Sequence, residues 1–360
     1  MNDLLHIASH FLIKGTPVSV KPLGDGLIND TYKVITAGED TPDYVLQRIN
    51  TDIFTDVDML QRNIISVTGH IRSKLREAGE TDLSRKTLTV VMADDGKAYR
   101  MEDGSCWRMT VFIPRARTFD TVNTAHSYSA GTAFGRFEAM LADIGEMPGE
   151  IIPDFHNMEL RLRQLDDAVT NDAAGRASGV RDLLGELERR AFDMCEAERL
   201  HREGVLPKRV CHCDTKVNNI MFDEDGSVLC VIDLDTVMPG FVFSDYGDFL
   251  RSAANTGLED DPDPGNVSFD MDIFRAFTRG YIAEARSFLL PVETSRLPYA
   301  AALFPYMQCV RFLTDYINGD TYYKTRYEEH NLVRARAQFR LLQSAEEHAG
   351  EMRAFVESCL

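Results

Sequence analysis

Several features that would indicate particular protein classes are missing from the 360-residue sequence. It has no apolar run of about 18 residues, the length that a membrane-spanning helix requires. Lysine and arginine form no run, and acidic residues outnumber basic ones by 57 to 39, giving a net charge of −18. Nucleic-acid-binding proteins normally carry a basic stripe. The sequence therefore predicts neither a membrane nor a nucleic acid as a partner.

A disulfide framework and a secretion signal are also missing. The seven cysteines are an odd number scattered over a long chain, which is typical of a reducing compartment. Residues 1–15, MNDLLHIASHFLIKG, lack the basic segment and the small-residue cleavage site of a signal peptide. They contain His6 and His10 and predict an amphipathic helix. We expect a cytoplasmic protein.

Two common nucleotide-binding motifs do not occur. The sequence has no G-x-x-x-x-G-K-[ST] phosphate loop and no G-x-G-x-x-G motif after a strand. Their absence argues against P-loop and dinucleotide-binding folds.

What is present predicts two domains, since the chain is long for one. The hydrophobic share of 44% and charged share of 27% are those of a globular protein. The first part predicts strands at 16–23, 29–36, 44–49, 87–93 and 106–113, with a helix over about 56–77. Later segments have helical spacing, at about 122–144, 180–203, 270–288, 296–317 and 326–357, with short strands over 208–236. The change falls near 113–116, so we predict domains at 1–114 and 115–360.

The most informative segment is HCDTKVNN, from His212 to Asn219. It has the H-x-D-x-x-x-x-N spacing of a kinase catalytic loop. In such a loop Asp214 accepts or orients the proton of the attacking hydroxyl, and Asn219 reaches a magnesium ion on the phosphates. The bare spacing is equally consistent with a strand-to-turn segment in which the aspartate forms an Asx turn.

Two further signals follow the same order as in kinases. Asp233 and Asp235 come directly after an apolar strand, where a buried carboxylate is costly unless it is paired or binds a cation. A kinase uses such a group to hold Mg²⁺, whereas the simpler interpretation is acids facing solvent. Gly24-Asp25-Gly26 lies between two strands and could present backbone N–H groups to phosphate, although most such tripeptides are hairpin turns.

Cys211-His212-Cys213 permits two rival interpretations. A zinc site would need a second C-x-x-C or H-x-x-x-H pair at the usual spacing, and the sequence has none. A cysteine–histidine nucleophile would need a geometry that spacing does not reveal. Cys213 alternates with Asp214 on a short strand and is expected to pack inward.

Taken together, these motifs resemble the aminoglycoside phosphotransferase and choline kinase superfamily and, within it, the N-acetylhexosamine 1-kinases. The resemblance covers nearly the whole chain. Its segments are GDGLINDTY (24–32), YVLQRIN (44–50), SAGTAFGRFEAML (129–141), IPDFHN with Arg161 (152–161), HCDTKVNN (212–219), VIDLDTVMPG (231–240), DYGDFLRSAANT (245–256) with Glu259-Asp260, and GDTYYKTRY with NLVRARAQ (319–338).

The resemblance implies an α+β, two-lobed, protein-kinase-like fold. A small N-terminal lobe would have an antiparallel sheet and one helix, and a larger lobe would be mainly helical, with Mg²⁺ and ATP bound between them. The implied reaction transfers the γ-phosphoryl group of ATP to the anomeric 1-hydroxyl of GlcNAc or GalNAc. Asp214 would be the catalytic base, and Asn219 and Asp233 the magnesium ligands.

The remaining roles follow by position. Gly24, Asp25 and Gly26 would form the phosphate lid, and backbone groups of Phe112 and Ile113 would bind adenine. The sugar contacts implied are Asn29, Asp30, His156, Arg161 and Asp235.

The third strand departs from the kinase pattern. It has no lysine, so Arg48 is the candidate for the α- and β-phosphates, although a one-residue shift in register would turn Gln47 inward instead. The following helix offers Gln61 and Asn63 where a kinase has a glutamate.

Three alternatives stay open. The acceptor could be an aminoglycoside, choline or a ribose derivative. The protein could bind nucleotide as an inactive pseudokinase, or bind sugar without chemistry. The sequence leaves the choice between GlcNAc, GalNAc and plain hexoses open, as it does the oligomeric state.

Overall fold

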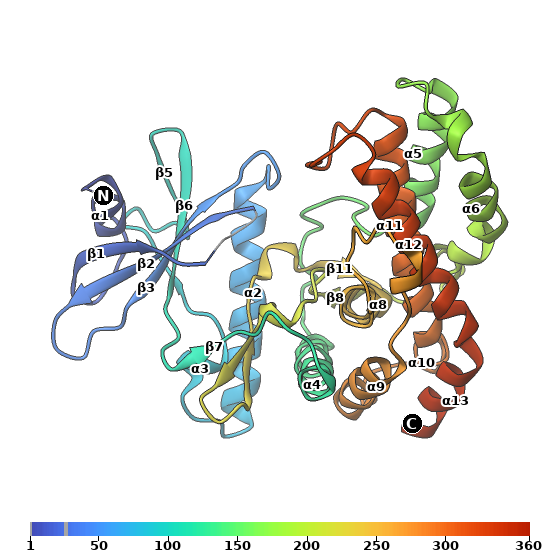
Figure 1. The fold of residues 1–360 in the computed structure, drawn as a ribbon. Coiled ribbons are helices and arrows are strands. Elements are labelled where there is room, and N and C mark those ends of the chain that lie inside the picture. Colours follow the sequence, from blue (N-terminus) through green and yellow to red (C-terminus); the bar gives the residue numbers. More distant parts are fainter. Residues whose placement is uncertain (1, 25–27) are drawn as a thin grey trace. The chain divides into compact units, whose positions relative to one another are not determined.

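The computed structural model describes residues 2–24 and 28–360 (Figure 1). Asp25 and Gly26 of the predicted phosphate lid lie outside the described residues. The chain forms two compact units, described separately below. The N-terminal unit comprises Met1–Thr118, Asp143–Ile152 and Ile220–Met238, and the C-terminal unit comprises Phe119–Ala142, Pro153–Asn219 and Pro239–Leu360. Two segments after residue 114, the predicted domain boundary, thus belong to the N-terminal unit.

The N-terminal unit is built on a six-stranded antiparallel sheet with the order β1-β2-β3-β6-β4, in which β5 also pairs with β6. Its strands are β1 (Thr16–Pro22), β2 (Asp30–Ala37), β3 (Tyr44–Ile49), β4 (Val90–Val91), β5 (Arg100–Glu102) and β6 (Ser105–Val111). Its helices are α1 (Asn2–Ser9), α2 (Val57–Glu77) and the single-turn α3 (Leu83–Lys86). The predicted single helix of this lobe corresponds to α2, and the structure adds the short helices α1 and α3.

One face of this sheet packs against α1. Ile7, Ala8 and Phe11 of the N-terminal segment form a core cluster with Leu46 of β3 and Met109 of β6. Side chains alternate between faces along a strand, so residues at even positions of β3 share the face that α1 covers. Odd positions of β3 point to the opposite face, and this alternation determines where Gln47 and Arg48 lie.

A second antiparallel sheet joins distant parts of the sequence within the N-terminal unit. It has the order β10-β9-β7, with β7 (Ala116–Arg117), β9 (Ile220–Asp223) and β10 (Val228–Val231). Arg85 of α3 is buried and makes two hydrogen bonds to the Asp223 carboxylate at the end of β9, at 3.1 and 2.7 Å. The segment that carries Asp233 is thereby part of this unit.

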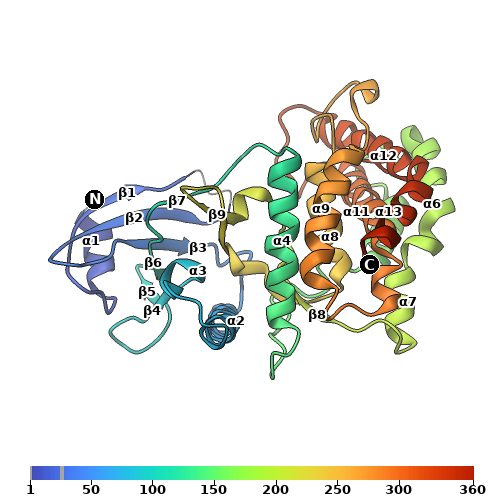
Figure 2. The ribbon, with the colours of Figure 1, turned by 90° about the horizontal axis from the view of Figure 1, so that it is seen from below.

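The C-terminal unit is mainly helical. It contains α4 (Thr124–Leu141), α5 (Met158–Asn171), α6 (Arg181–Met194), α7 (Glu196–Arg202), α8 (Val242–Ala253), α9 (Met271–Ala285), α10 (Pro291–Thr294), α11 (Leu297–Ile317), α12 (His330–Glu347) and α13 (Ala349–Cys359), with the short strand β8 (Arg209–Cys211) paired to β11 (Met238–Gly240). Helices α4 and α9 lie side by side (Figure 2). The prediction of a mixed fold with an antiparallel N-terminal sheet and a helical C-terminal region is confirmed.

Some predicted elements differ in detail from the observed ones. The segments 180–203 and 326–357, each predicted as one helix, are divided in two in the structure, at Cys195 and His348. The sequence predicts one helix in each case because the apolar spacing continues across the break. Helices α5 and α8 were not predicted. Every residue from Val242 to Leu250 of α8 is buried, so its polar stripe, which includes Asp245 and Asp248, faces other parts of the protein instead of solvent.

Among residues 2–24 and 28–360, each helix is either too short or too polar to cross a bilayer.

Candidate active site

The segment that carries Asp214 is fixed by an aspartate of α8. The Asp245 carboxylate accepts hydrogen bonds from the backbone N–H groups of His212 and Cys213, each at 2.7 Å, and Asp245 is completely buried. Cys213 has a φ of +64°, in the left-handed region that non-glycine residues rarely adopt. The two hydrogen bonds hold this strained backbone, which presents the next residue, Asp214.

A second aspartate of α8, Asp248, also holds the backbone of the segment that carries Asp214. Asp248 accepts a hydrogen bond from the Thr215 N–H at 3.0 Å, and the Thr215 hydroxyl donates to the Asp245 carbonyl oxygen at 2.7 Å. Burial, opposed by the Arg251 guanidinium, raises the pKa of Asp248. The segment is therefore anchored to α8 at three residues, His212, Cys213 and Thr215.

Asp214, Lys216 and Asn219 are brought together by this geometry. The Asp214 side chain keeps about 30% of its surface exposed, and its Oδ1 lies 2.6 Å from Nζ of Lys216. The Asn219 amide nitrogen donates to the Asp214 carbonyl oxygen at 2.8 Å and approaches its Oδ2 at 3.3 Å. Burial lowers the pKa of Lys216, but the Asp214 carboxylate more than offsets this and raises it. Asp214 thus has the exposure that a catalytic base needs and a cation beside it.

Below this segment lies a buried acid pair. Glu138 of α4 accepts a hydrogen bond from the Tyr281 hydroxyl, and its carboxyl group faces that of Asp245. Burial and the neighbouring Asp245 raise the pKa of Glu138 well above its ordinary value. Two carboxylates sharing a buried site cannot both ionise readily, so Glu138 keeps its proton while Asp245 serves as the acceptor for the backbone.

The Asp233 segment is held within the N-terminal unit. Asp233 has a φ of +60°, so it is also in the left-handed region. Asp235, two residues on, is buried and forms a bidentate ion pair with Arg108 of β6. Its Oδ2 also accepts a hydrogen bond from the Asn29 amide at 2.6 Å. Backbone strain of this kind clusters at functional sites and persists where the surroundings hold it.

Arg108 supplies a buried positive charge next to this segment. Burial lowers the pKa of Arg108, but the carboxylates of Asp235 and Asp233 more than offset this and raise it above its usual value. Gln47 of β3 lies directly opposite Arg108 in the sheet and accepts a hydrogen bond from its Nε at 3.0 Å. Gln47 therefore shares the face that carries Asp235.

Arg48 points to the other face of the sheet. It pairs with Asp30 across β2 and β3, with Nε 2.7 Å from Oδ2, and both side chains are about half exposed. Asn29 is buried and accepts a hydrogen bond from the Asn50 N–H at 2.9 Å. Of the predicted sugar contacts, Asn29 and Asp235 thus join in one buried network, while Asp30 belongs to an exposed ion pair.

The predicted nucleotide contacts also have defined places in the N-terminal unit. Gly24 has a φ of +71°, with no atom within 4 Å of the position a Cβ would take. The Phe112 N–H donates to the Asp43 carbonyl oxygen at 2.9 Å, and Nζ of Lys33 lies 3.8 Å from the Phe112 ring centroid. Ile113 is buried.

The predicted sugar contacts of the C-terminal unit lie in a cationic, aromatic environment. His156 stacks on Phe155 with a centroid distance of 4.4 Å, and the Arg161 guanidinium donates to the Phe155 carbonyl oxygen at 2.6 Å. Burial, followed by the charges of Arg311 and Arg161, lowers the pKa of His156 well below its ordinary value, so the imidazole is neutral. Burial and Arg311 also lower the pKa of Arg161.

The middle of helix α2 has Gln61 and Asn63 where a lysine–glutamate pair would need an acid. Asn63 is bonded to the backbone of Gly149, through both its amide nitrogen and its oxygen, and to the Val237 carbonyl. Gln61 is buried, and its amide atoms have no hydrogen-bond partner in the described part of the chain.

Four residues of the site had no role assigned from the sequence, namely Arg108, Glu138, Asp245 and Asp248. The two aspartates lie in DYGDFLR, which was part of the resemblance, and their spacing of three on one helix could have indicated a shared face. Arg108 and Glu138 stand in ordinary strand and helix patterns without such a signal.

Comparisons with solved structures define the class of fold. The chain is similar to spectinomycin phosphotransferase in complex with ADP and spectinomycin, with a TM-score of 0.56 at 12% identity, covering 97% of this chain and 98% of that one. An aminoglycoside phosphotransferase from Alicyclobacillus acidocaldarius matches with a TM-score of 0.61 at 12% identity, covering 98% and 96%. A choline kinase from Cryptosporidium parvum matches with a TM-score of 0.55 at 12% identity, covering 99% and 98%. The fold is therefore that of the small-molecule kinases.

Sequence comparison identifies the family directly. Residues 19–281 match the phosphotransferase enzyme family (APH), and the chain belongs to this family. The matched range includes Gly24, Asp214, Asn219 and Asp233. The family supports ATP-dependent kinase activity, with the acceptor still to be assigned.

Proposed function

We propose that the protein is a cytoplasmic N-acetylhexosamine 1-kinase, which transfers the γ-phosphoryl group of ATP to the anomeric 1-hydroxyl of GlcNAc or GalNAc. The proposal rests on the motif resemblance and on one observation in the C-terminal unit. In the segment around His156, where the resemblance implies sugar contacts, burial and the charges of Arg311 and Arg161 lower the pKa of the imidazole well below its ordinary value.

Asp214 is the proposed catalytic base. Its carboxylate is held at the end of a strained, hydrogen-bonded backbone and is accessible, so it can accept the proton of the attacking hydroxyl. Lys216 balances the charge of that carboxylate. The rigid anchoring by Asp245 and Asp248 matters because phosphoryl transfer depends mostly on positioning and charge stabilisation.

Asn219 and Asp233 are the proposed ligands of Mg²⁺. An amide oxygen and a carboxylate are the hard oxygen donors that this ion prefers. The Asn219 amide nitrogen is engaged with Asp214, which fixes the side chain and leaves its carbonyl oxygen as the donor atom. When bound, the ion would neutralise the charge of the β- and γ-phosphates. One related structure, amicoumacin kinase, contains AMP-PNP and Ca²⁺.

The nucleotide contacts are proposed for the N-terminal unit. Gly24, with Asp25 and Gly26, would cover the phosphates, and backbone groups at Phe112 and Ile113 would bind adenine. Gln47 lies on the sheet face that carries Arg108 and Asp235, whereas Arg48, the contact expected from the sequence for the α- and β-phosphates, points to the opposite face and pairs with Asp30. Asp235 would orient Asn29 from within the buried network.

The acceptor is proposed to be a neutral sugar because of the charges near His156. Arg311, Arg161, Arg251 and Lys208 all act on this imidazole, and each lowers its pKa. Arg251 is already paired with Asp248 and Glu259, so Arg311 and Arg161 are the cations that would disfavour a positively charged acceptor, whereas hydroxyl and N-acetyl oxygens accept hydrogen bonds from arginine. His156 and Arg161 are the proposed sugar-binding residues.

An acceptor panel tests the proposal. ADP release from Mg²⁺-ATP would be measured with GlcNAc, GalNAc, glucose, galactose, kanamycin and choline, and the product phosphate would be located by ³¹P NMR. We expect turnover on the N-acetylhexosamines and an anomeric phosphate. Turnover on kanamycin or choline alone would replace the sugar assignment, and ATP binding without turnover on any acceptor would indicate a pseudokinase.

A further inference from the structure

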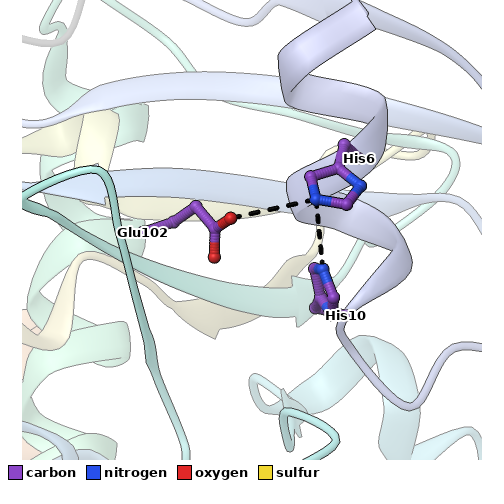
Figure 3. Close-up of side chains that lie close together, drawn as sticks. All are labelled: His6, His10 and Glu102. Carbon is purple, nitrogen blue, oxygen red and sulfur yellow. Dashed lines mark hydrogen bonds and ion pairs between the residues drawn. The ribbon is translucent and has the colours of Figure 1, made fainter.

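A cluster of metal-ligating side chains lies in the N-terminal unit, apart from every residue assigned to nucleotide or sugar. His6 of α1, His10 just after that helix and Glu102 of β5 point toward one another (Figure 3). Nε2 of His6 lies 3.4 Å from Nε2 of His10 and 3.8 Å from Oε1 of Glu102. The three ligand atoms lie within 4.8 Å of one another.

The spacing of the two histidine nitrogens matches a tetrahedral metal site. Zinc binds imidazole nitrogen at about 2.0–2.1 Å, and two ligands at tetrahedral angles are then about 3.4 Å apart. The separation of His6 and His10 has this value in the protein. His10 stands four residues after His6 in the turn that follows α1, where its backbone N–H donates to the Ile7 carbonyl oxygen at 3.1 Å, and Glu102 approaches from the sheet.

Two further residues fix the orientation of the cluster. Oδ2 of Asp94 lies 2.8 Å from Nδ1 of His10, the arrangement that orients metal-bound histidines in many proteins. Arg100 donates to Oδ1 of Asp94 and to Oε2 of Glu102, each at 3.0 Å. Arg100 thus occupies one oxygen of each carboxylate, and the other oxygen of each faces a histidine.

The hydrogen-bond pattern leaves a surplus of lone pairs at the centre of the cluster. Because Nδ1 of His10 donates to Asp94, its Nε2 carries a lone pair directed at His6. Nε2 of His6 faces this lone pair and the Glu102 carboxylate together, and a single N–H cannot satisfy both fully. A divalent cation accepts all three lone pairs at once.

We infer that His6, His10 and Glu102 bind one zinc ion, with water as the fourth ligand. Two imidazoles and a carboxylate are a ligand set that suits Zn²⁺ better than Mg²⁺ or Ca²⁺, which prefer oxygen alone. The ion would tie α1 to the β5–β6 hairpin, so it would stabilise the N-terminal unit without entering the phosphoryl-transfer reaction.

Calorimetric titration of ZnCl₂ into the full-length, tag-free protein tests this inference. The protein would first be treated with a chelator and kept with a non-thiol reductant. We expect one zinc ion per chain and a rise of a few degrees in the Tm with excess zinc, because a ligand that binds only the folded state stabilises it. Bound Co²⁺ should show the intense visible absorption of a tetrahedral site without thiolate charge-transfer bands.

Matched variants identify the ligands. His6→Ala, His10→Ala and Glu102→Gln should each weaken zinc binding at least tenfold and abolish the rise in Tm. The His6 side chain is about 64% exposed, so its replacement should leave the metal-free Tm unchanged. His348→Ala is the control, because His348 also faces a carboxylate, that of Glu351 at 3.5 Å, but has no second histidine beside it among the described residues.

Two outcomes would overturn the assignment. One is the absence of stoichiometric zinc binding by the wild-type chain. The other is equal zinc affinity in the wild-type protein and both histidine variants, which would locate the bound ion at the cysteines or elsewhere. Neither outcome would affect the proposed kinase activity, which the acceptor panel measures in magnesium without zinc.

Discussion

Arg108 forms a bidentate ion pair with Asp235, and both side chains are at least 94% buried. The two residues come from distant parts of the sequence but belong to one unit, in which Asp235 follows the proposed metal ligand Asp233 by two positions. Removing ions from water is costly, so such a pair stabilises a fold only when both partners are present. The pair also fixes the segment after Asp233 to β6, next to the strained backbone at Asp233.

Loss of one partner should therefore be severe. Arg108→Met leaves the Asp235 carboxylate buried without its cation and should lower the free energy of unfolding by about 3–5 kcal/mol. The double variant Arg108→Met/Asp235→Leu should recover most of the loss. Arg48→Met, which breaks an exposed pair with Asp30, should cost at most about 1 kcal/mol. Denaturant unfolding measures all three, and equal effects of the two single variants would contradict the expectation.

Replacement of the proposed base should remove catalysis and leave the fold intact. Asp214→Asn should lower kcat by about 10²- to 10⁴-fold, the range typical of general acid–base catalysis. Because the side chain is partly exposed and the backbone is held by Asp245, the Tm should stay close to that of the wild type. ADP release gives the rate, with the turn residue Asp225→Asn as a control. Robust turnover by folded Asp214→Asn would refute the assignment.

The buried proton on Glu138 should make stability depend on pH. Its pKa lies well above the ordinary 4.5, so above that pH unfolding releases a proton. Stability is then highest below pH 4.5 with respect to this group and falls as pH rises toward the folded-state pKa, by up to about 1.4 kcal/mol per unit.

Glu138→Gln tests this directly, since the amide can replace the protonated acid between Tyr281 and Asp245. The variant should lose part of the downward slope of stability that begins as the pH rises above 4.5. Urea unfolding at several pH values measures the slope, with Glu224→Gln as an exposed control. An unchanged slope would mean that Glu138 is ionised in the folded protein.

The contact between α4 and α9 should not tolerate a methyl group at Gly131. A Cβ there would lie 2.1 Å from the Phe277 carbonyl oxygen and 2.7 Å from the Tyr281 nitrogen, both backbone atoms of α9. Gly131→Ala should therefore destabilise the protein by at least about 1–3 kcal/mol, despite the higher helix propensity of alanine. Gly179→Ala, with open space around it, is the control for thermal unfolding. Equal Tm values would show that the helices can separate at little cost.

Local patterns were sufficient to predict part of this structure. The apolar spacing of α2 and the alternation in β1 to β3 gave elements that end within a residue or two of those observed. The spacing from Asp214 to Asn219 predicted two side chains that do lie together, because both belong to one short segment.

Relationships across the chain could not be predicted in the same way. Arg108 meets Gln47 through the register of β3 and β6, and meets Asp235 through the packing of a segment far along the sequence. The proton on Glu138 depends on burial beside Asp245, and sequence spacing contains no information on that burial. Helix α8 is a different case, since its apolar residues Val242, Tyr246 and Phe249 recur at helical spacing and this pattern could have predicted it.

The path of the chain between the two units has a consequence for biosynthesis. The chain enters the N-terminal unit again at Ile220 and leaves it after Met238, bringing in β9, β10 and the partner of Arg108. A ribosome that has made only the first 118 residues has therefore not yet supplied everything this unit needs, and Arg108 would be an unpaired cation in it. We expect the N-terminal unit to complete its folding only after α4, α5, α6 and α7 of the C-terminal unit have been synthesised. For the same reason, recombination at a single point near residue 118 would not yield an intact unit.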